Sequence, residues 1–151
     1  MSDNDDRRHR KSRKVLNRLL ALEQYSLANF LLYAPPWTTP DEEPLVETVR
    51  RIAADQQENA TRIGQLLFDR YGYAESGQFP FEFTAYDDLA LDYLLQPLLD
   101  HQRRLVEEVA RCVEQLADDP EAKQLAEEVL ASEKRHLEQL ERLPVPAQRG
   151  R

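Results

Sequence analysis

The chain has 151 residues, of which 41% are apolar, 32% charged and 8% aromatic, with a net charge of −8. This length and apolar content suit one domain with one core, and the scarcity of glycine and aromatics favours long charged helices over a β-sandwich. The composition excludes a disordered chain, and a single cysteine excludes a disulfide mini-protein. No apolar run approaches the ~18 residues of a membrane span and no signal peptide is recognisable, so we expect a cytoplasmic protein.

Positive charge is concentrated near the N-terminus. Six of the 20 Lys and Arg residues lie between positions 7 and 14, and residues 15–151 carry 14 Lys and Arg against 25 Asp and Glu. We expect residues 1–14 to form a basic flexible arm, with 15–143 as the folded body and 144–151 as a flexible tail. Because the body is acidic, nucleic acid is excluded as a partner except through the arm at 7–14.

Apolar spacing predicts four helices, at 15–33, 43–71, 87–116 and 121–143. The proline-rich segment 34–40 ends the first helix and Gly72 ends the second. Pro97 either kinks the third helix or marks its true start. Two helical hairpins with short turns, joined by a long connection over residues 71–84, predict an all-α four-helix bundle with a crossover between helices two and three. Phe81, Phe83 and Tyr86 indicate that this connection is ordered and packed.

A few polar residues fall on the apolar faces when positions are placed at about 100° per residue. All four helices contribute to this inward set: Glu23, Gln56, Asn59, Gln102, Glu133 and His136. A buried, unpaired carboxylate lowers the stability of the fold by roughly several kcal/mol, so it must be protonated, paired or bound to a cation. The four contributions therefore predict one shared cluster. The order within it repeats imperfectly, because each half has one polar group followed on the next helix by a polar pair three residues apart.

Two stretches carry a resemblance to a known family. Leu16-Asn17-Arg18-Leu19-Leu20-Ala21-Leu22-Glu23 and Glu133-Lys134-Arg135-His136-Leu137-Glu138, together with the crossover, resemble the bacterioferritin and ferritin-like four-helix carboxylate proteins over residues 15–143. In that family, one Glu from each of two helices and a Glu-x-x-His from each of the other two hold two iron or manganese ions. The resemblance implies a ferritin-like fold, iron binding or storage, and ferroxidase activity.

The chain departs from that family at three of the six ligand positions, where Gln56, Asn59 and Gln102 replace Glu, His and Glu. Two metals close together would be poorly neutralised, because hard cations favour charged oxygen ligands. One hypothesis is therefore a diminished centre that holds at most one iron or other divalent ion through Glu23, Glu133 and His136, with weak or no ferroxidase activity and the amides as weak neutral ligands.

The alternative hypothesis is a metal-free ferritin-like structural or assembly module, whose inward amides donate hydrogen bonds to the carboxylates as a polar plug. Helix-three register stays open at this point, since rotation after Pro97 could turn Asp100 or His101 inward in place of Gln102.

Further expectations concern partners and cofactors. Gln57 follows Gln56 where the family's haem-ligating methionine would stand, and Met1 is the single methionine, which excludes haem bound through methionine. We expect a homo-oligomer, a dimer or larger, with a ferritin-like homologue as another candidate partner and no membrane. Cys112 lies in the apolar stripe of the third helix and is interpreted as a core residue.

Overall fold

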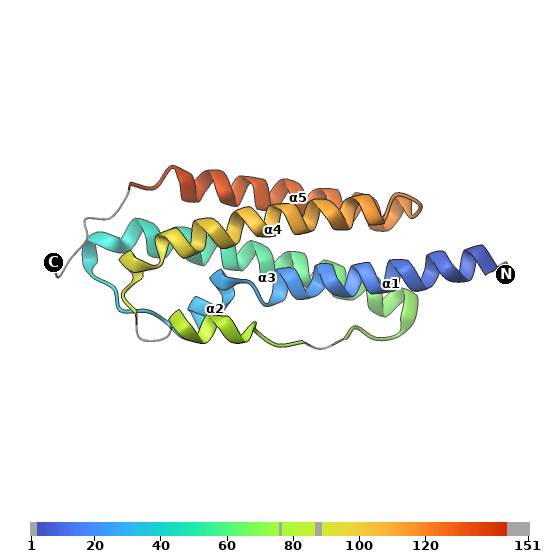
Figure 1. Cartoon of the computed structure of the whole chain (residues 1–151), viewed down its shortest axis with the longest axis horizontal. Helices are drawn as coiled ribbons and strands as arrows, with labels where there is room; N and C mark the ends of the chain where they lie inside the picture. The colour runs from blue at the N-terminus through green and yellow to red at the C-terminus, as the bar shows by residue number, and fades with distance from the viewer. Residues whose placement is uncertain (1–2, 76, 87–88, 145–151) are drawn as a thin grey trace.

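The computed structural model describes residues 3–75, 77–86 and 89–144, and in this part the chain is all-α (Figure 1). Long helices pack side by side as a bundle, with three short 3-10 turns in the connections. The α-helices are α1 (Asp3–Gln24), α2 (Leu27–Tyr33), α3 (Glu43–Tyr71), α4 (Leu95–Gln115) and α5 (Pro120–Glu141). The 3-10 turns are η1 (Pro40–Glu42), η2 (Phe81–Tyr86) and η3 (Leu91–Tyr93).

The first expected helix differs from its prediction at both ends. It starts at Asp3 rather than near position 15, so residues 3–14, expected as a flexible arm, form the first turns of α1. It also breaks after Gln24, and α2 begins at Leu27 with Ser26 as its N-cap. The Ser26 hydroxyl accepts a hydrogen bond from the Asn29 backbone N–H at 3.2 Å, and this bond satisfies a donor that the new helix start leaves free.

The boundaries of the other helices follow ordinary start and stop signals. The prediction for α3 is confirmed, and Gly72 ends it with a φ of +83°, a left-handed conformation that glycine adopts without strain. Pro97 lies in the first turn of α4 and so marks the start of that helix instead of kinking it. Asp119 caps α5 by accepting from the Ala122 backbone N–H. The expected tail over 144–151 lies outside the described residues beyond Pro144.

The connection between α3 and α4 runs back along the length of the bundle, so these two helices point in the same direction (Figure 1). It is partly packed, as expected from its aromatic residues. Phe83 is buried against Phe30, with ring centroids 5.6 Å apart, whereas Phe81 is 84% exposed. Of these two phenylalanines, Phe83 packs the crossover against the bundle and Phe81 does not.

Two groups of buried apolar side chains form the core. One group is centred on Leu16, Ile63, Leu105 and Val129, and the other on Leu27, Ile52, Leu98 and Leu140. Along α1, α3, α4 and α5 the inward polar residues fall between these two groups, which places a polar layer across the middle of the bundle. None of the helices in the described part of the chain is long and apolar enough to cross a bilayer.

Candidate functional site

The six inward polar residues are all buried, and none of them is more than 8% exposed. Glu23 lies on α1, Gln56 and Asn59 on α3, Gln102 on α4, and Glu133 and His136 on α5. They are brought together in one hydrogen-bonded cluster, named here the polar layer. The helical period therefore predicted these burials correctly.

Glu133 is the main acceptor of the polar layer. Gln56 donates from Nε2 to Oε2 of Glu133 at 3.0 Å, and Gln102 donates from Nε2 to Oε1 at 3.0 Å. The same Gln102 nitrogen reaches the backbone carbonyl of Glu133 at 2.9 Å, and His136 Nδ1 lies 2.5 Å from Oε1. Groups from three helices thus stabilise one negative charge.

Glu23 lies in a different environment. Its Oε1 accepts from Asn59 Nδ2 at 2.8 Å, and that nitrogen also approaches the Ser132 hydroxyl at 3.3 Å. Within the described residues, no N–H or O–H donor reaches its Oε2. Burial, followed by the nearby charge of Glu133, raises the pKa of Glu23 well above its ordinary value. This shift favours the protonated acid, whose carboxyl proton is available to the hydrogen bond that Glu23 shares with Glu133.

The charge state of Glu133 follows from these donors. Burial opposes its ionisation, but the hydrogen bonds from Glu23 and His136 outweigh burial and lower its pKa. Burial also disfavours the charged form of His136, yet its bonds to Glu133 and Asp55 raise the pKa of the imidazole. The surroundings in the polar layer thus favour the charged forms of Glu133 and His136 and the neutral form of Glu23.

Both ring nitrogens of His136 are engaged. Nδ1 faces Glu133, and Nε2 lies 2.8 Å from Oδ2 of Asp55, whose side chain is about half exposed. Asp55 was not among the predicted site residues, although it lies three residues after Ile52 and four before Asn59, at the margin of the inward stripe of α3. That position was a usable signal for a partner of the histidine.

Ser26 and Asn29 are two further buried residues of the site, and the sequence did not predict them because it did not predict the helix break after Gln24. Gln56 Oε1 accepts from the Ser26 hydroxyl at 2.5 Å and from Asn29 Nδ2 at 3.3 Å. These donors lie on the side of Gln56 opposite Glu133, so they fix which end of the amide faces the carboxylate. The available signal was Ser26 with Asn29 three residues later, a pattern typical of a helix start.

The register of α4 is settled in favour of Gln102, which is 3% exposed, while the Asp100 side chain is 52% exposed. His101 lies at the margin and has a separate role. Its Nε2 accepts from the Leu27 backbone N–H at 3.2 Å, another free donor at the start of α2. Burial lowers the pKa of His101 to about 4, so the imidazole is neutral and can accept this bond.

A divalent cation needs lone pairs that converge on one point. Here the side-chain nitrogens of Gln56, Asn59 and Gln102 direct N–H groups at the two carboxyl groups. Both nitrogens of His136 are held by carboxylates. Over the described ranges, no group of three or more His, Cys, Asp or Glu residues is placed to hold a metal. The residues present therefore do not fit a divalent ion in this arrangement.

Comparison with protein-family models, with curated proteins and with solved structures finds no match to this chain. The ferritin-like assignment of residues 15–143 therefore stays a prediction. The packing of the helices as an all-α bundle and the buried polar layer rest on the structure itself.

Proposed function

We propose that this chain is a metal-independent member of the ferritin-like class, which acts as a structural or assembly module and not as a ferroxidase. Its polar layer occupies the level at which the resemblance implies a metal pair. The long crossover between parallel α3 and α4 is consistent with this class.

The observation that carries the proposal is the direction of the three amides. Gln56 and Gln102 donate to Glu133, and Asn59 donates to Glu23, so N–H groups occupy the directions from which a metal would approach the carboxyl oxygens. The amide of Gln56 cannot simply turn over, because its oxygen is held by Ser26 and Asn29. Gln102 donates to two acceptors at once, which fixes its orientation in the same way.

The charge balance supports the same conclusion. Because the surroundings favour the neutral form of Glu23 and the charged form of His136, the imidazolium of His136 can balance the Glu133 carboxylate without a metal cation. Hydrogen-bonded polar networks inside a protein favour one specific packing over alternatives. We infer that the polar layer fixes the relative register of the helices that meet in it.

A second candidate function is a single divalent metal held by Glu23, Glu133 and His136. The observation that favours it is Glu23 Oε2, a buried oxygen that would accept a cation if Glu23 were ionised. This candidate requires Glu23 to lose its proton and His136 Nδ1 to turn a lone pair toward the ion.

Elemental analysis of the purified protein, combined with anaerobic calorimetric titration of the metal-free protein with Fe(II), tests the proposal. We expect no bound metal and no saturable heat. One equivalent that disappears in Glu23→Gln would establish the second candidate instead. Two equivalents with fast oxygen consumption would restore a ferroxidase and overturn the proposal.

A further inference from the structure

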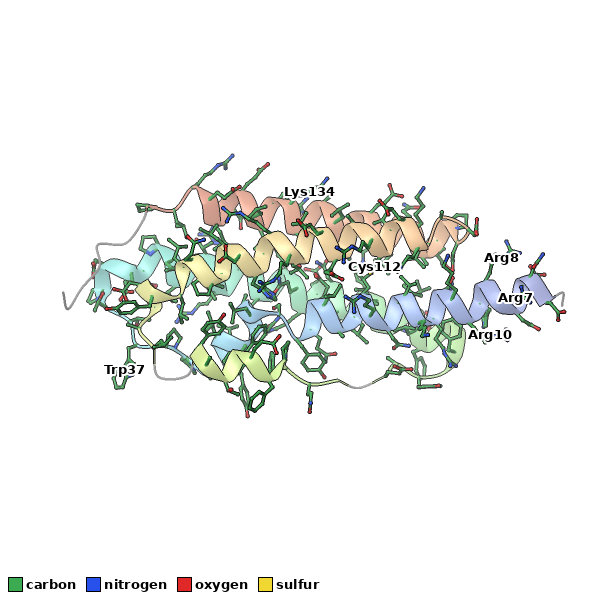
Figure 2. All side chains as sticks on the ribbon, in the orientation of Figure 1. Arg7, Arg8, Arg10, Trp37, Cys112 and Lys134 are labelled. Carbon is green, nitrogen blue, oxygen red and sulfur yellow. The ribbon has the colours of Figure 1, made fainter. Side chains whose placement is uncertain are left out.

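The N-terminal end of α1 extends beyond the rest of the bundle (Figure 1). The first residue of α1 in the apolar core is Val15, so most of the first three turns lie outside the core. Residues 7–14 contain six cations, and Arg7, Arg8 and Arg10 lie on the projecting part (Figure 2). We name residues 3–14 the basic end.

Two of these six cations have a partner among the described residues. Arg8 pairs with Asp5, and the guanidinium of Arg13 lies 5.8 Å from the centre of the Tyr73 ring. Within the described part of the chain, the other four form no ion pair: Arg7, Arg10, Lys11 and Lys14. Their spacing of three, four and seven residues places them on one face of the helix, where like charges repel unless an anionic partner covers them.

The opposite end of the molecule carries exposed aromatic residues, as the position of Trp37 shows (Figure 2). Trp37 is 72% exposed and Tyr33 78%, and Tyr93 is also more than half exposed. The backbone holds this region together, because the Leu91 N–H donates to the Trp37 carbonyl at 2.9 Å. An apolar hollow of about 290 Å³ lies beside it, lined in part by Leu32, Pro35, Pro36, Val46 and Leu91. We name segments 31–50 and 89–96 the aromatic end.

The aromatic end is also acidic. Its carboxyl groups outnumber its cations by five to one, because Arg50 is the single Lys or Arg in these segments. The carboxyl groups belong to Asp41, Glu43, Glu47 and Asp92 and to the buried Glu42, and Arg50 lies within ion-pair distance of Glu43 and Glu47. The two ends of the molecule therefore differ in charge sign, and the acidic one exposes the residue types that dominate protein interfaces.

We propose that the basic end of one copy docks on the aromatic end of a second copy. Arginine stems can cover Tyr33 and Trp37 through cation–π contacts while their guanidinium groups meet the surrounding carboxylates. Nucleic acid is a poorer occupant, since the acidic remainder of the chain repels a polyanion. A pair of copies joined in this way still has one free basic end and one free aromatic end. Further copies can therefore add, and the product is an open chain or a closed ring of copies.

This inference deepens the proposed assembly role and rests on it. Sedimentation velocity in EDTA, over a wide concentration range at low and at high salt, tests it. We expect the average mass to rise with concentration at low salt and to fall back at high salt, because the screening length drops from ~10 Å at 0.1 M to ~3 Å at 1 M. A monomer at every concentration, or an assembly that ignores salt, would overturn it.

Variants identify the two surfaces. R7E/R10E/K11E and W37A should each abolish the rise in mass. R104E/K134E/R135E changes the net charge as much as the first variant but alters exposed cations of α4 and α5, and it should assemble like the wild type. Assembly that survives W37A, or that the control also abolishes, contradicts the proposal.

A mixing experiment excludes loss of folding as the explanation. R7E/R10E/K11E and E43R/E47R/D92R should each stay monomeric alone, yet they should associate when mixed, because each supplies a complementary end to the other. Failure of the mixture to associate would overturn the pairing of these surfaces. The metal content is measured separately, so a metal-bound chain that still assembles refutes the proposed metal-independent role, whereas a metal-free chain that stays monomeric refutes this inference.

Discussion

The two buried glutamates are predicted to respond very differently to the same substitution. If Glu23 is a neutral donor, Glu23→Gln preserves both of its hydrogen bonds, because the new amide N–H can donate to Glu133 and its oxygen can accept from Asn59. Glu133→Gln is different. It replaces one of the two oxygens that receive Gln56, Gln102 and His136 with another donor.

The expected magnitudes follow from these bonds. Each buried polar group that loses its partner costs about 1–3 kcal/mol. Breaking a buried charge pair by removing one member costs about 3–5 kcal/mol. Since Glu133 and His136 are no more than 1% exposed, we expect Glu133→Gln to lower the free energy of unfolding by about 3–5 kcal/mol. We expect Glu23→Gln to change it by no more than about 1 kcal/mol.

Urea unfolding of the two variants in EDTA, followed by circular dichroism, measures this difference. The pair is its own control, since each variant replaces one carboxyl group of the polar layer by an amide. Equal losses of stability, or a larger loss in Glu23→Gln, would refute the assignment of the proton to Glu23. If Glu23 and Glu133 held a metal ion, both variants would instead lose affinity for that ion to a similar extent.

Three more predictions concern other parts of the structure. Asp119→Ala should cost about 2–3 kcal/mol at pH 7, because it removes the cap of α5 and the paired bonds from Arg70. The hydrogen bonds from Arg70 lower the pKa of Asp119, so its contribution is complete above its ordinary value of 3.8 and is lost as pH falls; unfolding measured at pH 7 and near pH 3 should show the penalty shrinking, and a constant penalty would contradict it. Ser26→Ala should cost about 1–2 kcal/mol in thermal unfolding, through the lost cap of α2 and the lost shorter of the two hydrogen bonds to the Gln56 oxygen, with exposed Thr61→Ala as a near-neutral control. Cys112 is completely buried and burial raises the pKa of its thiol to about 11, so alkylation in native buffer should be slow and should accelerate only in denaturant; rapid native labelling would show that the core opens locally.

The sequence predicted the long helices better than their interruptions. Periodic leucines and the Gly72 stop predicted α3 closely, because both signals are local. The break between α1 and α2 was missed because residues 15–33 keep apolar spacing across it. What stabilises the break is tertiary, since His101 on α4 accepts the Leu27 N–H. The basic residues were likewise interpreted as a flexible arm, although Tyr71 from the end of α3 donates to the His9 carbonyl and packs against its ring.

The site shows where sequence periodicity stops being informative. A helical period places Gln56 on the inward face whether the residue is Gln or Glu, and these two side chains have nearly the same shape. Whether Gln56 acts as a metal ligand or as a hydrogen-bond donor depends on which end of its amide faces Glu133. The groups that contact the other end of the amide decide this orientation. Ser26 and Asn29 donate to the Gln56 oxygen from that side. Their side chains reach it because the helix breaks before Leu27. The helix break and the orientation of the Gln56 amide are therefore coupled through Ser26 and Asn29, and the residue type at position 56 does not indicate this coupling by itself.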